Sequence, residues 1–117
     1  MIIERTHYFA RPGTADRALA IRRRACAVRL ALGLPAGEIF VKAPGGDGSE
    51  ADVTWQCSYA DEAEQAADMA ARAASADFAA VRADMTAAIA RFERHVFRRT
   101  DLALASGMRA TSLAGSL

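Results

Sequence analysis

The segment that most constrains the fold of this chain is residues 2–13, IIERTHYFARPG, which place ionisable groups on both faces of one short strand. Its alternation and its Ile, Tyr and Phe content predict a β-strand over residues 2–10, which Pro12-Gly13 ends. A strand between a core and water usually carries polar groups on one face only. We therefore expect helices to cover one face of this strand and a partly wet interior, which tolerates polar groups, to cover the other.

A helix is predicted to follow, from an N-cap at Thr14 to about Leu32, where Gly33 and Pro35 end it. Its apolar face carries residues at spacings of three and four, namely Ala18, Ile21, Ala25, Val28 and Leu32. These spacings favour a helix packed along one face of a sheet.

Two strands are predicted next, over residues 38–43 and 52–59. Four residues of the second strand share one face: Val53, Trp55, Cys57 and Tyr59. The connecting PGGDG resembles a phosphate-binding loop only in its glycine content, because it lacks a following Lys-Ser/Thr and a helix. We interpret it as a turn.

The second half of the chain predicts two helices and a final strand. Asp61 caps a helix that ends near Ala74, and Ser75 restarts a second one. An apolar stripe follows, made of Phe78, Val81, Met85, Ile89 and Phe92. Residues 91–99 alternate again and form a last strand or the exit of the helix into one, whereas residues 101–117 lack a period and are predicted to be a tail.

The resulting order, β-α-β-β-α-α-β, is the ferredoxin-like split pattern, an α+β fold with an antiparallel sheet and helices on one face. In this topology the first strand lies centrally, beside the third and fourth strands. The chain then consists of one domain over residues 1–100 and the tail over residues 101–117. Because the helices leave one face of the sheet uncovered, we expect a second copy to cover it, which makes a homodimeric α+β barrel. The composition agrees, since 29 residues are Ala and only 30 are larger apolar residues, so a thin core gains from burying a second surface.

Charge and hydropathy argue against several partners. A net charge of +1 gives no strong field for nucleic acid or a membrane surface, and no stretch approaches the ~18 apolar residues of a membrane span. The N-terminus lacks a signal-peptide pattern, so we expect a cytoplasmic protein in which Cys26 and Cys57 are half-buried free thiols. Fourteen Arg against one Lys, with so much Ala, is typical of GC-rich bacterial codon usage.

The run RRRACAVR on the first helix invites a nucleic-acid interpretation. Arg22 and Arg29 flank the apolar face, whereas Arg23 and Arg24 diverge onto other sides, which spreads the charge. We expect these side chains to snorkel and to pair with acidic residues at the surface.

The opening segment resembles the first strand of NIPSNAP-like proteins, which commonly reads I-Y-E-x-R-x-Y-x-x-x-P-G. Glu4, Tyr8, Pro12 and Gly13 stand in matching places. The resemblance covers about residues 2–102 and implies the dimeric α+β barrel fold.

Three later stretches extend this resemblance. VTWQCSYADEAEQA is similar to the third strand of the family, with Tyr59 at its tyrosine, although the usual Trp falls at Cys57 here. SADFAAV resembles the family's D-P-E-W stretch, with Phe78 in the place of Trp, and FERHVFRRTDL resembles the closing strand, with Glu93 at its glutamate.

The two histidines are candidates for chemistry. His7 could act as a general base at neutral pH, but no paired nucleophile is apparent, so a strand histidine hydrogen-bonded in an interface is favoured. His95 is expected near His7, and with Glu93 or Glu4 the pair could bind a metal. No H-x-x-H or C-x-x-C spacing supports that site, so neither a metal nor a cofactor is expected. Haem, which related barrels handle, would need one of these histidines as its axial ligand.

Trp55 and Tyr59 could form a stacking wall for a planar ligand, although ordinary core packing is somewhat favoured. If they line a pocket, Arg5, His7 or Tyr8 would be its polar partners. The candidate pocket residues are therefore Glu4, Arg5, His7, Tyr8, Trp55, Tyr59 and His95.

The sequence favours a protein that binds or transforms a small organic molecule in a pocket of a homodimeric barrel. The resemblance extends to barrels that include cofactor-independent oxygenases, in which Arg5 and His7 would stabilise a substrate anion and Trp55 would stack on it. The alternative is a non-enzymatic dimerisation or interaction module whose interior is filled by side chains. No catalytic residue is assigned.

Overall fold

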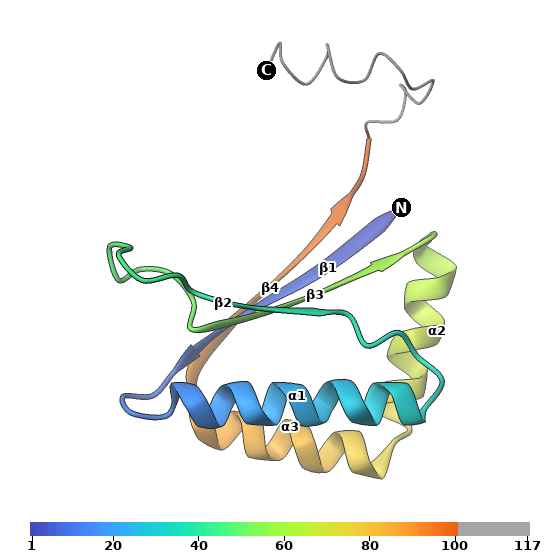
Figure 1. The fold of residues 1–117 in the computed structure, drawn as a ribbon. Helices are drawn as coiled ribbons and strands as arrows, with labels where there is room; N and C mark the ends of the chain where they lie inside the picture. The colour runs from blue at the N-terminus through green and yellow to red at the C-terminus, as the bar shows by residue number, and fades with distance from the viewer. Residues whose placement is uncertain (101–117) are drawn as a thin grey trace.

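The computed structural model describes residues 1–100, which form four strands and three helices in the predicted order (Figure 1). The elements are β1 (Ile2–Ala10), α1 (Ala15–Ala31), β2 (Glu38–Val41), β3 (Val53–Tyr59), α2 (Glu62–Ala73), α3 (Ala76–Ala88) and β4 (Ile89–Arg98). This confirms the α+β, ferredoxin-like fold class. The tail predicted over residues 101–117 lies outside the described residues.

The sheet has the order β2-β3-β1-β4, and each neighbouring pair is antiparallel. The first strand is therefore central, as predicted, between β3 and β4. In the register, Glu4 lies opposite Cys57 and Val96, whereas His7 lies opposite Thr54 and Glu93. Because successive side chains of a strand point to opposite faces, this register divides the sheet residues into two sets.

The helices lie on one side of the sheet, with α1 and α3 side by side (Figure 1). The even-numbered residues of β1 point toward them, since Ile2, Glu4 and Thr6 are buried. The odd-numbered residues point away, onto a face that no helix of the described chain covers. We call these the helix face and the open face of the sheet.

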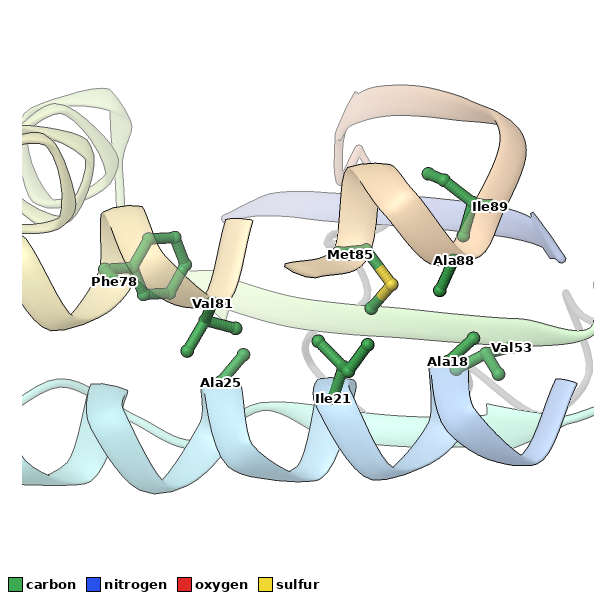
Figure 2. Packing of buried hydrophobic residues seen from close by; sticks show 9 residues of the cluster. All are labelled: Ala18, Ile21, Ala25, Val53, Phe78, Val81, Met85, Ala88 and Ile89. Carbon is green, nitrogen blue, oxygen red and sulfur yellow. The ribbon is translucent and has the colours of Figure 1, made fainter. Parts of the chain in front are cut away.

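The main core lies between α1, α3 and the helix face (Figure 2). Figure 2 shows Ala25 of α1 facing Val81 of α3, and Ala18 lying beside Val53 and opposite Ala88, so small residues of α1 stand where the two helices meet. The buried members are Ala18, Ile21, Ala25, Val53, Phe78, Val81, Met85, Ala88 and Ile89. A second cluster on the same face of the sheet consists of Ile2, Cys26, Trp55, Cys57 and Tyr59.

Of the two predicted helix caps, Asp61 is confirmed and Thr14 is not, while Ser75, at the predicted restart, also caps a helix. Asp61 accepts a hydrogen bond from the Glu64 amide at 2.9 Å, and Ser75 accepts one from the Phe78 amide at 3.0 Å. Thr14 stands at the N-cap position of α1, but its side chain caps nothing. Its hydroxyl instead donates to the carbonyls of Arg11 and Ala88, and so ties the turn after β1 to the end of α3.

The apolar stripe predicted from Phe78 to Phe92 spans two elements. The helix ends at Ala88, and Ile89 already begins β4, so Phe92 belongs to the period-2 pattern of a strand. On α1, Leu32 lies beyond the helix and is exposed, because the chain turns away there toward β2. Within residues 1–100, no helix has both the length and the apolar character needed to cross a membrane.

Candidate functional site

A cavity of about 460 Å³ lies between the helix face of the sheet and the helices. Its wall is largely aromatic and aliphatic, with Tyr8, Trp55, Phe78, Val81, Met85, Ile89 and Phe92. The charged residues on it are Glu4, Arg22, Arg72, Arg82 and Arg94. An apolar wall with a few polar groups at this volume is typical of a small-molecule site.

Glu4 forms the acidic part of the wall and is only 1% exposed. Arg72 of α2 donates to both of its oxygens, at 3.2 and 3.3 Å, and Arg94 of β4 donates to Oε2 at 2.9 Å. Gln65 adds a bond from Nε2 at 3.3 Å. This carboxylate therefore joins the first strand, the last strand and α2, and its lone pairs are largely used.

Arg29 and Asp68 form a second buried ion pair beside the cavity. Arg29 is 0% exposed and donates from Nη1 and Nη2 to the two oxygens of Asp68 at 3.0 and 2.6 Å. Its Nε donates to the Pro35 carbonyl at 2.7 Å. Burial alone would lower the pKa of Arg29, but the Asp68 carboxylate raises it overall.

The expectation that Arg22 and Arg29 snorkel at the surface is wrong. Both are buried under α1, and their guanidinium carbons lie 4.6 and 4.7 Å from the ring centroid of Trp55. Residues 18, 22, 25 and 29 follow a helical repeat of three and four. The two arginines therefore belong to the buried face of α1, which is turned slightly from the predicted stripe.

Trp55 is held in the wall by the loop before β2. Its Nε1 donates to the Ala36 carbonyl at 3.0 Å. Gly37 has a φ of +79°, and a Cβ on it would lie 2.4 Å from Trp55 Nε1. The sequence signal for this contact is a single glycine among other loop glycines, which cannot be distinguished by pattern.

Tyr59 is buried on the helix face of β3 but does not line the cavity. Burial, followed by the negative charge of Glu4, raises its pKa. Burial likewise raises the pKa of Cys57. Both cysteines are free and are more deeply buried than the predicted half-buried thiols.

The remaining candidates, Arg5, His7 and His95, lie on the open face, on the other side of the sheet from the cavity. His7 shares a hydrogen bond of 2.8 Å with Thr54, and Arg5 donates to Gln56 at 2.8 Å. The predicted proximity of the histidines is confirmed, since their ring centroids are 5.8 Å apart. Burial, then the positive charges of His95 and Arg5, lower the pKa of His7.

The candidate pocket residues thus divide between two places. Glu4, Tyr8 and Trp55 line the cavity, whereas Arg5, His7 and His95 do not. Among residues 1–100, no three His, Cys, Asp or Glu side chains lie close enough together to hold a metal ion.

Sequence reasoning missed four charged residues at the cavity: Arg22, Arg72, Arg82 and Arg94. A weak signal existed for one of them, because Asp68 and Arg72 are spaced four apart on α2 and form a 2.8 Å ion pair. Arg94 carried none, since its contact with Glu4 depends on the pairing of β1 with β4.

Comparison with known proteins relates this geometry to solved structures. No family model and no curated protein matches the sequence. An uncharacterised NIPSNAP domain protein from Burkholderia xenovorans superposes with a TM-score of 0.68 at 15% identity, over 87% of this chain and 97% of that one. The fold is that of the NIPSNAP domain. The predicted resemblance is therefore confirmed at the level of the fold.

Two further structures share this NIPSNAP-like fold. An antibiotic biosynthesis monooxygenase superposes with a TM-score of 0.62 at 16% identity, over 86% of this chain and 99% of that one. A dimeric protein of unknown function and ferredoxin-like fold from Bacteroides fragilis superposes with a TM-score of 0.59 at 8% identity, over 84% and 95% of the two chains. At these identities the likeness concerns the fold alone.

Proposed function

We propose that this protein is a homodimer that binds a small organic molecule in the cavity between its helices and its sheet. The observation that carries this proposal is the cavity itself, which lies within the range of about 300–1,000 Å³ of ligand sites. Its aromatic and aliphatic wall would receive an apolar body, and its buried charges would orient it.

A binding role is favoured over an oxygenase because no free base is found among the described residues that line the cavity. A cofactor-independent oxygenase needs a base that takes a proton from its substrate. Glu4 is the carboxylate on the wall, and Arg72 and Arg94 hold both its oxygens. Both histidines face away from the cavity, so the oxygenase interpretation has no free base among the lining residues of the described chain.

The homodimer is supported by the open face of the sheet. Phe40 and Phe97 on this face are 47% and 43% exposed, while His7 and Arg5 on it are bonded to neighbouring strands. A second copy, packed sheet to sheet, would cover the aromatic rings and leave the polar groups paired. A structure of the same fold is described as dimeric.

The second candidate is an interaction module for which pairing is the main property. The exposed aromatic residues of the open face favour it, but it gives no role to the cavity. The two candidates differ in whether the cavity receives a ligand.

Native mass spectrometry of the purified protein tests both parts. We expect a dimer that carries a small organic mass, which is released on denaturation. The variant Thr86→Trp, on the cavity wall, should lose that mass, whereas Ala83→Trp, an exposed position of the same helix away from the cavity, should keep it. A monomer would contradict the homodimer, and a bare dimer that binds neither apolar organic acids nor their amides would favour the interaction module.

A further inference from the structure

Arg22 differs from Arg29, the other buried cation among residues 1–100. Its side chain is 4% exposed and lines the cavity, yet no carboxylate of residues 1–100 pairs with it. Its Nη1 donates to Tyr8 Oη at 3.0 Å, its Nη2 approaches the weak acceptor Cys26 Sγ at 3.9 Å, and its Nε has no hydrogen-bond partner. These partners are neutral, as is the ring of Trp55, whose centroid lies 4.6 Å from the guanidinium carbon, so no negative charge compensates Arg22.

Three other arginines at or beside the cavity all have carboxylate partners, whether they are buried or partly exposed. Arg29 is paired with Asp68, and Arg72 with Glu4 and Asp68. Arg94 is paired with Glu4. An unpaired buried charge is strongly destabilising unless a binding partner neutralises it, so the position of Arg22 at the cavity points to an anion in that cavity.

We propose that Arg22 binds the carboxylate of an apolar organic acid held in the cavity, an inference that rests on the proposed function and names its ligand class. A planar guanidinium matches a carboxylate through two donors at once. Tyr8 Oη accepts from Arg22, which leaves its own hydrogen free to donate to the same carboxylate. The two side chains together offer hydrogen-bond donors to one anionic group.

The charges of the wall favour a monoanion. Arg72 and Arg94 are already engaged with Glu4, and Arg82 lies exposed at the rim over the ring of Phe78. One buried unpaired cation suits one negative charge better than a phosphate dianion. The apolar body of the acid would lie against Val81, Met85 and Ile89 of the cavity wall.

The test uses isothermal titration calorimetry with the purified full chain and two matched probe pairs. These are 2-naphthoate with 2-naphthamide, and decanoate with decanamide; each amide keeps the shape of its acid but lacks the charge. We expect the native protein to bind the better acid about tenfold to a hundredfold more tightly than its amide, as a charge-assisted bond predicts.

Three variants test whether Arg22 is the residue that causes the preference for the acid over the amide. Arg22→Met keeps an unbranched side chain that can stay buried but removes the charge, and it should reduce the affinity for the acid to that for the amide. Its urea-unfolding midpoint should not fall, because it removes an unpaired buried charge; a purely structural arginine would lower it. Arg22→Lys should restore part of the preference for the acid, and Arg82→Met at the rim should leave the preference unchanged.

The outcomes separate this inference from the proposed function. If acid and amide bind equally well to the native protein, the cavity binds small molecules but the anion inference is overturned. If none of the four probes binds at millimolar concentration, the proposed function fails and the inference fails with it. The acid–amide comparison needs no variant, so the test holds even if Arg22→Met does not fold.

Discussion

The two sides of the sheet differ in how deeply they bury their ion pairs. On the side of the helix face, Arg29 of α1 and Asp68 of α2 form a pair that is nearly inaccessible to solvent. On the open face, Arg91 and Glu93 form a pair in which both side chains stay about half exposed. A buried pair is costly to break and an exposed one is almost neutral, so stability should depend on the first face and assembly on the second.

This division follows from the alternation of a single strand. Glu4 and Arg5 are adjacent in β1, yet Glu4 is enclosed by arginines at the cavity whereas Arg5 lies over the ring of Phe97 on the open face. Function divides in the same way, since ligand binding is proposed for one face and pairing for the other.

The largest effect is expected from the buried pair. Asp68→Ala leaves Arg29 uncompensated and also removes a partner from Arg72, so it should lower the free energy of unfolding by about 3–5 kcal/mol. Glu93→Ala on the open face should change it by less than about 1 kcal/mol. Urea unfolding at one fixed protein concentration measures both.

A double variant separates charge from packing in this result. Arg29→Met with Asp68→Leu should recover most of the loss, because apolar residues of similar volume replace a buried pair at little cost. Equal effects of Asp68→Ala and Glu93→Ala would show that the two faces do not differ in the way described.

The next effect concerns the placement of Trp55 on the helix face. Gly37→Ala should cost about 2–4 kcal/mol, because it combines a positive φ with a Cβ 2.4 Å from Trp55 Nε1. Gly33 has the same φ of +79°, but a Cβ on it would have nothing within 4 Å, so Gly33→Ala should cost only about 1–2 kcal/mol. Urea unfolding followed by Trp55 fluorescence measures both free-energy changes. If the two variants lose similar stability and the native Trp55 emission is unchanged in Gly37→Ala, then Gly37 is not needed to place Trp55.

A third prediction concerns the open face. Thr54→Arg places a charged side chain opposite His7, near the middle of the proposed interface, and should weaken the dimer at least about tenfold, or ~1.4 kcal/mol. Ala27→Arg, on the exposed side of α1, should leave the dimer unchanged. Sedimentation over a dilution series measures the dissociation constant, and an unaltered Thr54→Arg dimer would place the interface elsewhere.

The sequence alone predicted the element order, the central position of β1, the cap at Asp61 and the helix restart at Ser75, because these depend on local periodicity and turn chemistry. The same local reasoning could not choose the face of β1 that meets the helices. Adjacent residues of β1 have similar character, so both faces have an apolar end and a charged middle. The pairs are Ile2 and Ile3, Glu4 and Arg5, and Tyr8 and Phe9.

The charged part of the candidate site could not be predicted for a related reason. Arg22 and Arg29 were assigned to the surface because a helical wheel places them at the flanks of the apolar face, where arginine side chains snorkel. Arg29 is paired with Asp68, which lies on another helix 39 residues away. Arg22 has no carboxylate partner among residues 1–100 and lines the cavity instead. Both facts depend on tertiary structure, which a helical wheel does not contain.

The smallest effect is a pH dependence that belongs to the open face. Burial, then the charges of His95 and Arg5, lower the pKa of folded His7 below its ordinary 6.5. The unfolded chain therefore binds more protons than the folded one once the pH falls below about 6.5. The stability that neutral His7 contributes is complete above that pH and is lost as the pH falls toward the lowered folded value.

His7→Gln removes this titration and keeps a side chain able to bond Thr54, so its free energy of unfolding should fall less than that of the native protein between pH 7 and pH 5. His95→Gln removes one positive neighbour but leaves the burial of His7, so its curve should lie between the other two. Carboxylates that titrate in all three proteins cancel in the differences. Parallel curves would mean that His7 is as solvated in the folded protein as in the unfolded chain, and that no second copy covers the open face.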